Sequence, residues 1–409
     1  MAKYLYINLP AEGHVNPTLA VVKELVERGN QVVYYATDDF SSKITNTGAE
    51  FRSLGSGINI NQMMEEKEPN VIMDHFVQMI EGTVDKVSED IKNDSFDCVL
   101  YDANALPGKM IAKQHQLPSI STWSIFAIDD QGTMFEKLHE QSQSQTIIDP
   151  DRLNPWIHHW REKYDLDLPE FPQAMLCEGD LNIVFTSKYF QMEAEKFSDD
   201  TYTFVGPSLT EREDSESTFL PSTAHQPILF MSMGTVLNNQ PDLYQKVIEA
   251  FADFPGTVIM SVGKQIDISS LGAVPDHFIV KPYVPQLEVL KHTDVFITHC
   301  GMNSTNEALY HQLPLVMLPA GNDQPIIAQR VEELGAGIRL NIDTVSPNDL
   351  RQAVNEVIKN STYQQQAAKI SESFKNSGGY KRAVDTIQQF MEDYHFDHED
   401  HSKKYSETT

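Results

Sequence analysis

Two groups of polar residues in this sequence have the types and spacing to do chemistry. The first is the run His-Cys-Gly-Met-Asn-Ser at 299–304, followed one helical turn later by Glu307, which could accept a hydrogen bond from a ribose. Small and polar residues at the start of a helix are typical of an anion site, because free backbone N–H groups and the positive end of the helix dipole meet there. His299, Asn303 and Ser304 add side-chain donors. An ordinary helix cap would explain each feature singly, but the density of polar groups favours a binding site.

The second group is His14 and Asp102, each of which follows an apolar stretch that is typical of a buried strand. A hydroxyl group becomes a nucleophile as its proton leaves, and histidine is the commonest general base for that step. A carboxylate at the end of a neighbouring strand could orient the imidazole and stabilise its charged form. A surface histidine and a helix-capping aspartate are alternatives on residue type alone. Asp97 is a second candidate carboxylate, but it precedes its strand and should point away from His14.

The element that must carry His14 is a strand–loop–helix–strand unit at the start of the chain. Residues 4–9 predict a strand, a loop containing His14 follows, a helix is expected from about Pro17 to Arg28, and the next strand covers 31–36. This alternation predicts a doubly wound parallel α/β sheet, in which ligands bind at the carboxyl ends of the strands. The loop lacks the G-x-G-x-x-G fingerprint, which disfavours an NAD-dependent oxidoreductase.

A second unit of the same kind begins at a predicted strand over 228–232. The turn that follows contains Gly234, which would let the backbone approach a ligand, and Thr235, whose hydroxyl could donate to a phosphate oxygen. Further strands are expected at 257–262, 295–298 and 315–318. Ser261 lies near the end of one of these strands and is a weaker candidate for contact with a nucleotide.

Composition limits the class of protein. The chain of 409 residues exceeds one typical domain core, and its formal net charge of −28 argues against nucleic acid or an anionic membrane as a partner. No apolar run approaches the ~20 residues that a membrane span needs. Cys98, Cys177 and Cys300 are too few and too widely spaced for a disulfide framework or a zinc knuckle. We therefore expect a soluble, cytoplasmic protein with two domains.

Two other parts of the sequence have more than one interpretation. Residues 56–79 and 124–175 are rich in Met, Phe and Trp, which predicts either ordinary core or the adaptable walls of a hydrophobic pocket. The tail after residue 394 carries His395, His398 and His401 among acidic residues. A metal cluster is conceivable there, but a solvated charged tail is the favoured interpretation, and we expect no metal site.

The ordered set of motifs resembles the donor-binding signature of family 1 UDP-dependent glycosyltransferases. The matching residues are Tyr283-Val284-Pro285-Gln286, the run from His299 to Ser304 with Glu307, and Asp323-Gln324. The similarity extends over nearly the whole chain. It looks closest to the bacterial macrolide-glycosyltransferase branch, which includes Bacillus enzymes that glucosylate flavonoids and other phenols. Two positions depart from the plant pattern, since Tyr283 and Met302 stand where plant enzymes carry tryptophan.

The resemblance implies a GT-B fold, in which two Rossmann-like doubly wound domains face a central cleft. We expect an acceptor-binding domain at 1–207, a linker at 208–227 and a UDP-sugar-binding domain at 228–380, while residues 381–409 form a helix that returns to the first domain and a polar tail. The implied reaction is inverting, metal-independent transfer of glucose from UDP-glucose to a hydroxyl of a hydrophobic small molecule, such as a flavonoid, a phenol or a macrolide-like compound. UDP-glucose would be a co-substrate, and no cofactor would be needed.

The resemblance also implies roles for single residues. His14 would be the general base, and Asp102 would orient it. The UDP-sugar would be bound by residues of the second domain, namely Thr235, Ser261, Val284, Gln286, His299, Gly301, Asn303, Ser304, Glu307, Asp323 and Gln324. Among these, Asp323 and Gln324 would contact the sugar hydroxyls, Glu307 and Gln286 would hold the ribose, and the backbone of Val284 could pair with the uracil.

Two other functions stay open on sequence alone. A sugar-nucleotide epimerase can share this fold, and it would yield an epimer or a free sugar without an acceptor. A non-catalytic accessory protein would bind the UDP-sugar without turnover, although the presence of both His14 and Asp102 speaks against it.

Overall fold

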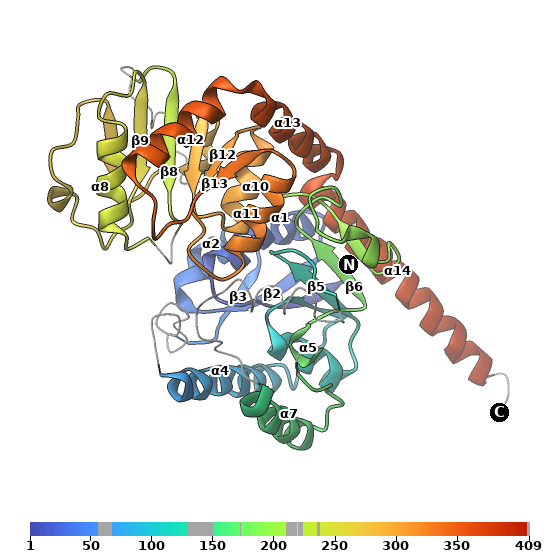
Figure 1. Cartoon of the computed structure of the whole chain (residues 1–409). Coiled ribbons are helices and arrows are strands. Elements are labelled where there is room, and N and C mark those ends of the chain that lie inside the picture. Colours follow the sequence, from blue (N-terminus) through green and yellow to red (C-terminus); the bar gives the residue numbers. More distant parts are fainter. Residues whose placement is uncertain are drawn as a thin grey trace. The chain divides into compact units, whose positions relative to one another are not determined.

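The computed structural model describes residues 1–55, 68–129, 150–171, 173–209, 219, 224–234 and 238–406. The described residues form two compact units, each built on a parallel sheet (Figure 1). The first unit consists of the chain up to Ser208 together with the segment from Ser377 onward, and the second lies between Leu209 and Asn376. Strands and helices alternate in both units, so the doubly wound α/β fold expected from the sequence is confirmed.

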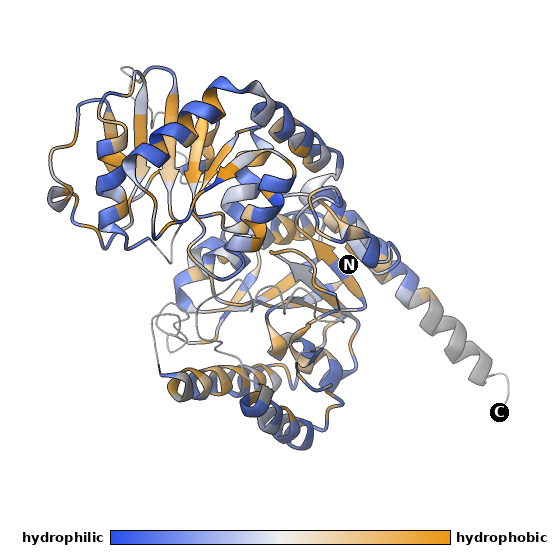
Figure 2. Ribbon diagram, in the orientation of Figure 1, coloured by the Kyte–Doolittle hydropathy of each residue, from blue (hydrophilic) through white to orange (hydrophobic). Residues whose placement is uncertain are grey.

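In the first unit, the described residues contain a seven-stranded sheet in the order β3-β2-β1-β4-β5-β6-β7. Its strands are β1 (Lys3–Ile7), β2 (Gln31–Ala36), β3 (Glu50–Ser53), β4 (Cys98–Asp102), β5 (Ser119–Trp123), β6 (Leu181–Val184) and β7 (Tyr202–Phe204). All neighbouring strands are parallel. The central strands β1, β2 and β4 are buried almost throughout and mostly apolar, because the sheet is covered on both faces (Figure 2).

Helices cover both faces of this sheet. α1 (Glu12–Glu27), α2 (Ser41–Thr45) and α14 (Gly379–Ser406) pack on one face, whereas α4 (Pro69–Asp90), α5 (Leu106–His115) and α7 (Pro150–Tyr164) pack on the other. Ala383, Val384 and Ile387 of α14 bury their side chains in the same core as α1. Arg28, at the end of α1, also donates hydrogen bonds to Asp385, at 2.6 Å, and to Gln388. The end of the chain is therefore part of the first unit.

The second unit contains, within the described residues, a six-stranded parallel sheet in the order β10-β9-β8-β11-β12-β13. Its strands are β8 (Ile228–Ser232), β9 (Thr257–Ser261), β10 (Phe278–Lys281), β11 (Val295–Thr298), β12 (Leu315–Met317) and β13 (Gly337–Arg339). Its helices are α8 (Pro241–Ala250), α9 (Gln286–Leu290), α10 (Met302–Tyr310), α11 (Gln324–Glu333), α12 (Pro347–Lys359) and α13 (Ser361–Asn376). α8 and α12 share one core with the sheet, and α10 packs against α11 and α13.

Each sheet has one point at which the strand order reverses. The chain of the first unit runs outward from β1 through β2 to β3 and then adds β4 on the other side of β1, and the second unit has the same arrangement at β8 and β11. The register pairs Ile7 with Tyr101 in one sheet and Ser232 with Thr298 in the other. Open α/β sheets bind ligands outside the carboxyl ends of the strands at such a point. The residues after these four strands are therefore the first place to look for a site.

The first helix begins earlier than the sequence predicted. α1 starts at Glu12, so His14 lies in its first turn rather than in a preceding loop, and Pro17 lies inside the helix. Proline is most frequent in the first turn, which is why Pro17 predicts a helix start. That prediction is wrong because an additional turn before Pro17 is held by the Asn8 side chain, which donates a hydrogen bond to the carbonyl of His14.

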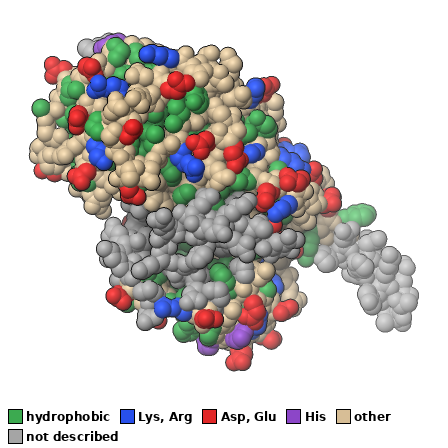
Figure 3. All heavy atoms as spheres, viewed as in Figure 1, with side chains coloured by type: hydrophobic (Ala, Val, Ile, Leu, Met, Phe, Trp, Pro, Cys, Tyr) green, Lys and Arg blue, Asp and Glu red, His purple; other side chains and the backbone are tan. Residues whose placement is uncertain are grey.

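The surface and the cysteines limit other functions. On the face shown in Figure 3, Asp and Glu side chains are interspersed with Lys and Arg over the described residues, and the basic groups do not gather into a stripe. None of the helices in the described part of the chain is long and apolar enough to cross a membrane. Cys98, Cys177 and Cys300 are all buried as free thiols.

Candidate active site

His14 and Asp102 lie together where the strand order of the first sheet reverses. His14 follows β1 in the first turn of α1, and Asp102 is the last residue of β4. The Nδ1 atom of His14 lies 2.9 Å from Oδ2 of Asp102, and the two side chains are 19% and 1% exposed. The Oδ1 atom of Asp102 accepts a hydrogen bond from the backbone N–H of Asn104. Asp97 lies at the other end of the strand, where it accepts a hydrogen bond from the backbone N–H of Lys3.

This geometry determines which ring nitrogen of His14 carries the proton. An ionised carboxylate only accepts hydrogen bonds, so the close contact between Nδ1 and Oδ2 requires a proton on Nδ1. The lone pair of the neutral ring is then on Nε2. When Nε2 takes up a proton, the buried carboxylate of Asp102 stabilises the charge that the ring gains. The pair has the arrangement of a general base and the group that orients it.

A buried chain of hydrogen bonds holds the helix turn that carries His14. The amide of Asn8 donates to the carbonyl of His14, at 3.1 Å, and to the hydroxyl of Tyr34, at 2.7 Å. The hydroxyl of Thr18 donates to the carbonyl of Val15, so its contact of 2.8 Å with Tyr34 must be a bond in which Tyr34 donates. Burial raises the pKa of Tyr34, which keeps that hydroxyl protonated. The donor of each hydrogen bond in this series is therefore known, and together the bonds hold the first turn of α1 in place.

Ser124 is a third polar residue beside His14 and Asp102, and no motif in the sequence pointed to it. It follows β5 directly, is 4% exposed, and places its hydroxyl 2.9 Å from Nδ1 of His14 and 3.1 Å from Oδ2 of Asp102. β1, β4 and β5 are consecutive neighbours in the sheet, so the residues that follow them converge. The only signal that could have identified Ser124 is the strand order, because a single serine after a strand is otherwise common.

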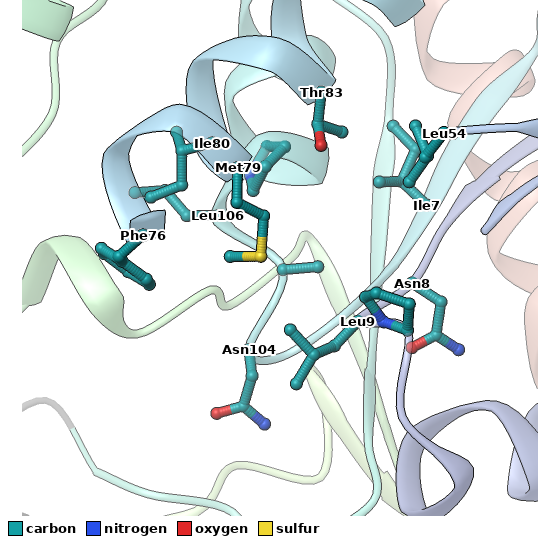
Figure 4. A pocket seen from close by; sticks show the side chains of 13 residues that line it. Ile7, Asn8, Leu9, Leu54, Phe76, Met79, Ile80, Thr83, Asn104 and Leu106 are labelled. Carbon is teal, nitrogen blue, oxygen red and sulfur yellow. The ribbon is translucent and has the colours of Figure 1, made fainter. Parts of the chain in front are cut away.

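An apolar pocket lies next to this group, entirely within the first unit. It lies between the loops after β1 and β4 and the helix α4 (Figure 4), with a cavity volume of about 20 Å³, whereas the space between its walls together with the open solvent at its mouth is about 380 Å³. Phe76 and Met79 of α4 lie on one side of this space and Leu9 and Asn104 on the other. The remaining lining residues are Ile7, Asn8, Pro10, Leu54, Ile80, Thr83, Ala105, Leu106 and Pro107.

Two residues of the pocket wall connect it with His14 and Asp102, which do not line it themselves. Asn8 donates a hydrogen bond to the backbone carbonyl of His14, and the backbone N–H of Asn104 donates one to Asp102. Phe76 and Met79 come from one of the two Met- and aromatic-rich segments in which the sequence predicted a hydrophobic pocket. The parts of those segments at 56–67, 130–149 and 172 lie outside the described residues. In the described part of the second segment, Trp160 is core, because its side chain is fully buried among α4 and α7.

In the second unit, His299 and two glycines lie where the strand order reverses. Gly234 comes soon after β8 with φ +74°, and Gly301 comes between β11 and α10. A Cβ atom added to Gly234 would lie 2.5 Å from Nε2 of His299, and one added to Gly301 would lie 2.6 Å away. Only glycine therefore lets these two backbone turns approach the imidazole so closely. Burial lowers the pKa of His299 to about 4, against the opposing effect of a hydrogen bond to the backbone of Ser232, so the ring is neutral near pH 7.

Three residues that the sequence assigned to a ribose and a helix terminus form one hydrogen-bonded group. The side-chain amide of Gln286, the first residue of α9, donates to Ser304, at 3.2 Å, and to Oε2 of Glu307, at 2.6 Å. Glu307 is only 2% exposed. Asn303 shares the first turn of α10 with Ser304. A buried carboxylate and an amide are thus held beside the helix N-terminus at which an anion is expected.

Asp323 and Gln324 lie at the start of α11, after β12. The side-chain oxygen of Gln324 accepts hydrogen bonds from the backbone of Ala320, at 2.8 Å, and Gly321, at 3.3 Å. This oxygen therefore holds its own loop, and the side-chain NH₂ group is the part of Gln324 suited to bind a ligand. Asp323 is the N-cap residue of α11, but its side chain makes no capping hydrogen bond.

The remaining candidate residues differ in how well they are placed. Ser261 ends β9 and pairs in register with Ser232. Val284 is 2% exposed, so its side chain is core, whereas the neighbouring Tyr283 is 55% exposed. Thr235 lies outside the described residues. No group of three His, Cys, Asp or Glu side chains that could hold a metal ion occurs among the residues that the structure describes.

Comparisons with known proteins show the family to which the chain belongs. Residues 206–384 match the family described as UDP-glucoronosyl and UDP-glucosyl transferase. The UDP-glucosyltransferase YojK of Bacillus subtilis strain 168 is 37% identical over 403 residues, which cover 95% of this chain and 97% of the relative. The NDP-glycosyltransferase YjiC of the same strain is 36% identical over 387 residues, which cover 94% of this chain and 96% of the relative.

A solved structure extends the likeness to the whole fold. The calicheamicin glycosyltransferase CalG4 matches with a TM-score of 0.83 and 26% identity, and the match covers 96% of this chain and 99% of that chain. The two parallel sheets of this chain are accordingly those of the GT-B fold. The sequence identity to YojK and YjiC extends over nearly the full length of both relatives. The chain is therefore a glycosyltransferase of the GT-B fold, and it belongs to the UDP-glucosyl transferase family in the bacterial branch that includes these Bacillus relatives.

Proposed function

We propose that this protein transfers glucose from UDP-glucose to a hydroxyl group of a hydrophobic small molecule, such as a flavonoid, a phenol or a macrolide-like compound, with inversion at the anomeric carbon. The observation that carries this proposal is the bond of 2.9 Å between His14 and the buried Asp102 beside an apolar pocket. A base next to an apolar pocket suits an acceptor that is an apolar body with one hydroxyl. We further propose that the first unit binds this acceptor and the second unit the UDP-sugar.

The proposed reaction uses Nε2 of His14 as the general base. As the acceptor oxygen attacks the anomeric carbon, its proton moves to Nε2, and Asp102 stabilises the imidazolium through Nδ1–H. The bond between the anomeric carbon and the diphosphate oxygen breaks, and UDP leaves with the electron pair. Because attack comes from the face opposite UDP, an α-linked donor gives a β-glycoside.

The negative charge that develops on the diphosphate needs donors, and the second unit offers several. We assign this role to the N-terminal turn of α10, with Gly301, Asn303 and Ser304, and to the neutral ring of His299. Thr235 belongs to the same proposed set. Such donors can supply the stabilisation that a divalent cation gives in other transferases, so we propose that the reaction proceeds without metal.

The rest of the UDP-sugar is assigned to residues around α9 and α11. We propose that Glu307 and Gln286 bind the ribose, that the backbone of Val284 pairs with the uracil, and that Asp323 and Gln324 bind the sugar hydroxyls. Ser261 is a further candidate for contact with the nucleotide. The names of the relatives YojK and YjiC, a UDP-glucosyltransferase and an NDP-glycosyltransferase, support a nucleoside diphosphate sugar as donor. The three buried free thiols fit a reducing, cytoplasmic compartment.

Product mass tests the proposal directly. The protein is incubated with UDP-glucose and a panel of phenols in the presence of EDTA, and the products are separated and weighed by liquid chromatography–mass spectrometry. We expect a hexose adduct of the phenol that is lost in His14→Ala and retained in His292→Ala, which removes an exposed histidine of the second unit. Binding of UDP without any adduct would support an accessory protein, and an epimer or free glucose as the only product would support an epimerase.

A further inference from the structure

The hydroxyl of Ser124 lies against both members of the proposed catalytic pair and has no part in the mechanism above. The three atoms Nδ1 of His14, Oδ2 of Asp102 and Oγ of Ser124 form a triangle with sides of 2.9, 2.9 and 3.1 Å. All three distances are within hydrogen-bonding range. Since Asp102 and Ser124 are 0% and 4% exposed, water cannot easily take the place of one partner.

The positions of the protons in this triangle can be deduced by counting donors. Oδ2 of an ionised carboxylate donates nothing, so the only protons are those on Oγ and, in one tautomer, on Nδ1. If Ser124 donated to a bare Nδ1, Oδ2 would face two lone pairs inside the protein without a donor, which is costly. If Ser124 donates to Oδ2, the proton on Nδ1 can be shared between Oδ2 and Oγ. The second arrangement satisfies every atom of the triangle.

We propose that Ser124 is a positioning residue for the transfer reaction, because its hydroxyl holds His14 and Asp102 in the arrangement with the proton on Nδ1 and the lone pair on Nε2. The inference rests on the proposed function, in which His14 is the base. Ser124 is a second donor to Oδ2, so a carboxylate that turned away from the imidazole would lose this bond as well. It also gives the ring N–H a second acceptor, which limits rotation of the ring.

The other groups near His14 and Asp102 do not hold the two side chains in this arrangement. The Oδ1 atom of Asp102 is taken by the backbone of Asn104. Tyr6 and Tyr34 lie close enough to Asp102 to feel its charge, but burial raises the pKa of both hydroxyls, so both stay neutral. Tyr6 bonds to Thr122 and Tyr34 to Asn8 and Thr18. Among the described residues, Ser124 is the side chain whose hydroxyl bonds to both members of the pair.

The test compares two acceptors that differ in acidity. An acidic phenol such as 4-nitrophenol needs little help from a base, whereas 4-methylphenol needs much more. Steady-state kcat and KM with UDP-glucose are measured for both acceptors in wild type, Ser124→Ala, Ser124→Thr and His14→Ala. Ser121→Ala is the matched control, because Ser121 is a fully buried serine of β5, the strand that Ser124 follows, and its hydroxyl has no hydrogen-bond partner in the described residues.

A positioning role predicts a selective effect. Ser124→Ala should lower kcat for 4-methylphenol by about 10- to 100-fold, lower kcat for 4-nitrophenol by about threefold or less, and leave both KM values nearly unchanged. Ser124→Thr keeps the hydroxyl and should stay within about threefold of wild type. Ser121→Ala should behave as wild type. If Ser124→Ala does not fold, Ser124→Cys gives the same comparison, because a thiol is only a weak donor.

Several results would overturn the inference. An equal loss of kcat for both acceptors in Ser124→Ala would indicate a structural role, and a Ser124→Thr variant as impaired as Ser124→Ala would show that the hydroxyl is not the cause. If Ser124→Ala had wild-type kinetics while His14→Ala was selectively impaired on 4-methylphenol, Ser124 would have no positioning role. The assignment of His14 as the base would still stand. A His14→Ala variant that is impaired equally on both acceptors would instead contradict the base assignment in the proposed function.

Discussion

A Cβ atom on Gly234 would lie 2.5 Å from Nε2 of His299, which means that the turn after β8 is shaped to admit one imidazole. Gly234 also has φ +74°, a backbone conformation that other residues adopt at a cost. The first prediction concerns both properties. Gly234→Ala should lower the free energy of unfolding by about 1–2 kcal/mol through backbone strain, and it should weaken UDP binding at least about tenfold by displacing His299.

Gly272 provides the matched control for Gly234. It has φ +89° as well, but a Cβ atom there would meet nothing within 4 Å. Gly272→Ala should therefore show a similar loss of stability in urea denaturation and unchanged UDP binding in calorimetry. If Gly272→Ala and Gly234→Ala weakened UDP binding equally, the effect would come from general destabilisation rather than from His299.

The lowered pKa of His299 predicts how the free energy of unfolding depends on pH. Burial lowers its pKa from an ordinary value of 6.5 to about 4, so the folded protein resists protonation of this ring. Above pH 6.5 the group is neutral in both states and its contribution is fully present. As the pH falls from about 6.5 to about 4, the unfolded chain binds the proton first, and the folded state loses about 3 kcal/mol relative to it. Below that range the contribution no longer changes.

The difference between wild type and His299→Gln isolates this effect from all other titrating groups. Urea denaturation at pH 7, 5.5 and 4 should show wild type losing stability more steeply than the variant. Parallel curves for the two proteins over this range would mean that the imidazole is protonated as easily in the folded state as in the unfolded chain.

Variants of Asn8 and Tyr34 distinguish two functions of the buried hydrogen bonds near His14. These bonds hold His14 in position, and they stabilise the fold. Asn8→Leu keeps nearly the shape of the side chain but removes both N–H donors, so the carbonyl of His14 loses its anchor. We expect kcat to fall at least about tenfold, together with a loss of about 1–3 kcal/mol in stability. Tyr34→Phe removes one hydroxyl but leaves the bond from Asn8 to His14. It should cost stability, with kcat within about threefold of wild type.

Circular dichroism melts and steady-state kinetics on the same samples distinguish these outcomes. The hypothesis that Asn8 fixes the position of the base fails if the two variants lose kcat in proportion to their stability.

A variant of Met79 tests the proposed acceptor pocket. Its side chain points into the space beside Asn104, so Met79→Trp should fill part of it (Figure 4). We expect kcat/KM for a three-ring flavonoid to fall at least about tenfold, with a smaller change for a single-ring phenol and no change in UDP binding. Val71→Trp is the control, because Val71 lies on the same helix and is 38% exposed. Equal effects of both variants on both acceptors would place the acceptor elsewhere.

Much of the fold and part of the candidate site could be predicted from the sequence. The residues from His299 to Ser304 form one short run, so their turn is visible without any knowledge of the fold. His14 and Asp102 each follow an apolar strand, and a parallel sheet puts such residues at one edge. Ser124 could not be predicted, because a lone serine gains meaning only from the order β1-β4-β5, which depends on contacts between segments far apart in the sequence.

Two local details were also beyond the sequence. Pro17 predicted the start of the first helix five residues too late, because the stabilising partner of the earlier turn is Asn8, a side chain outside the helix. Gln324 is the first residue of α11, directly after a loop. Its side-chain oxygen, however, bonds to the loop backbone, a choice that depends on the final loop geometry.

The pocket and the proposed base come from different parts of the first unit. His14 and Asp102 depend on strand ends and on a buried hydrogen-bond chain, whereas Phe76, Met79, Ile80 and Thr83 come from α4, which belongs to the connection between β3 and β4. A crossover helix can exchange its pocket-facing side chains without altering the strands at either end. Under the proposed function, acceptor preference can therefore diverge among descendants of one ancestral enzyme while the proposed base and the aspartate beside it are inherited unchanged.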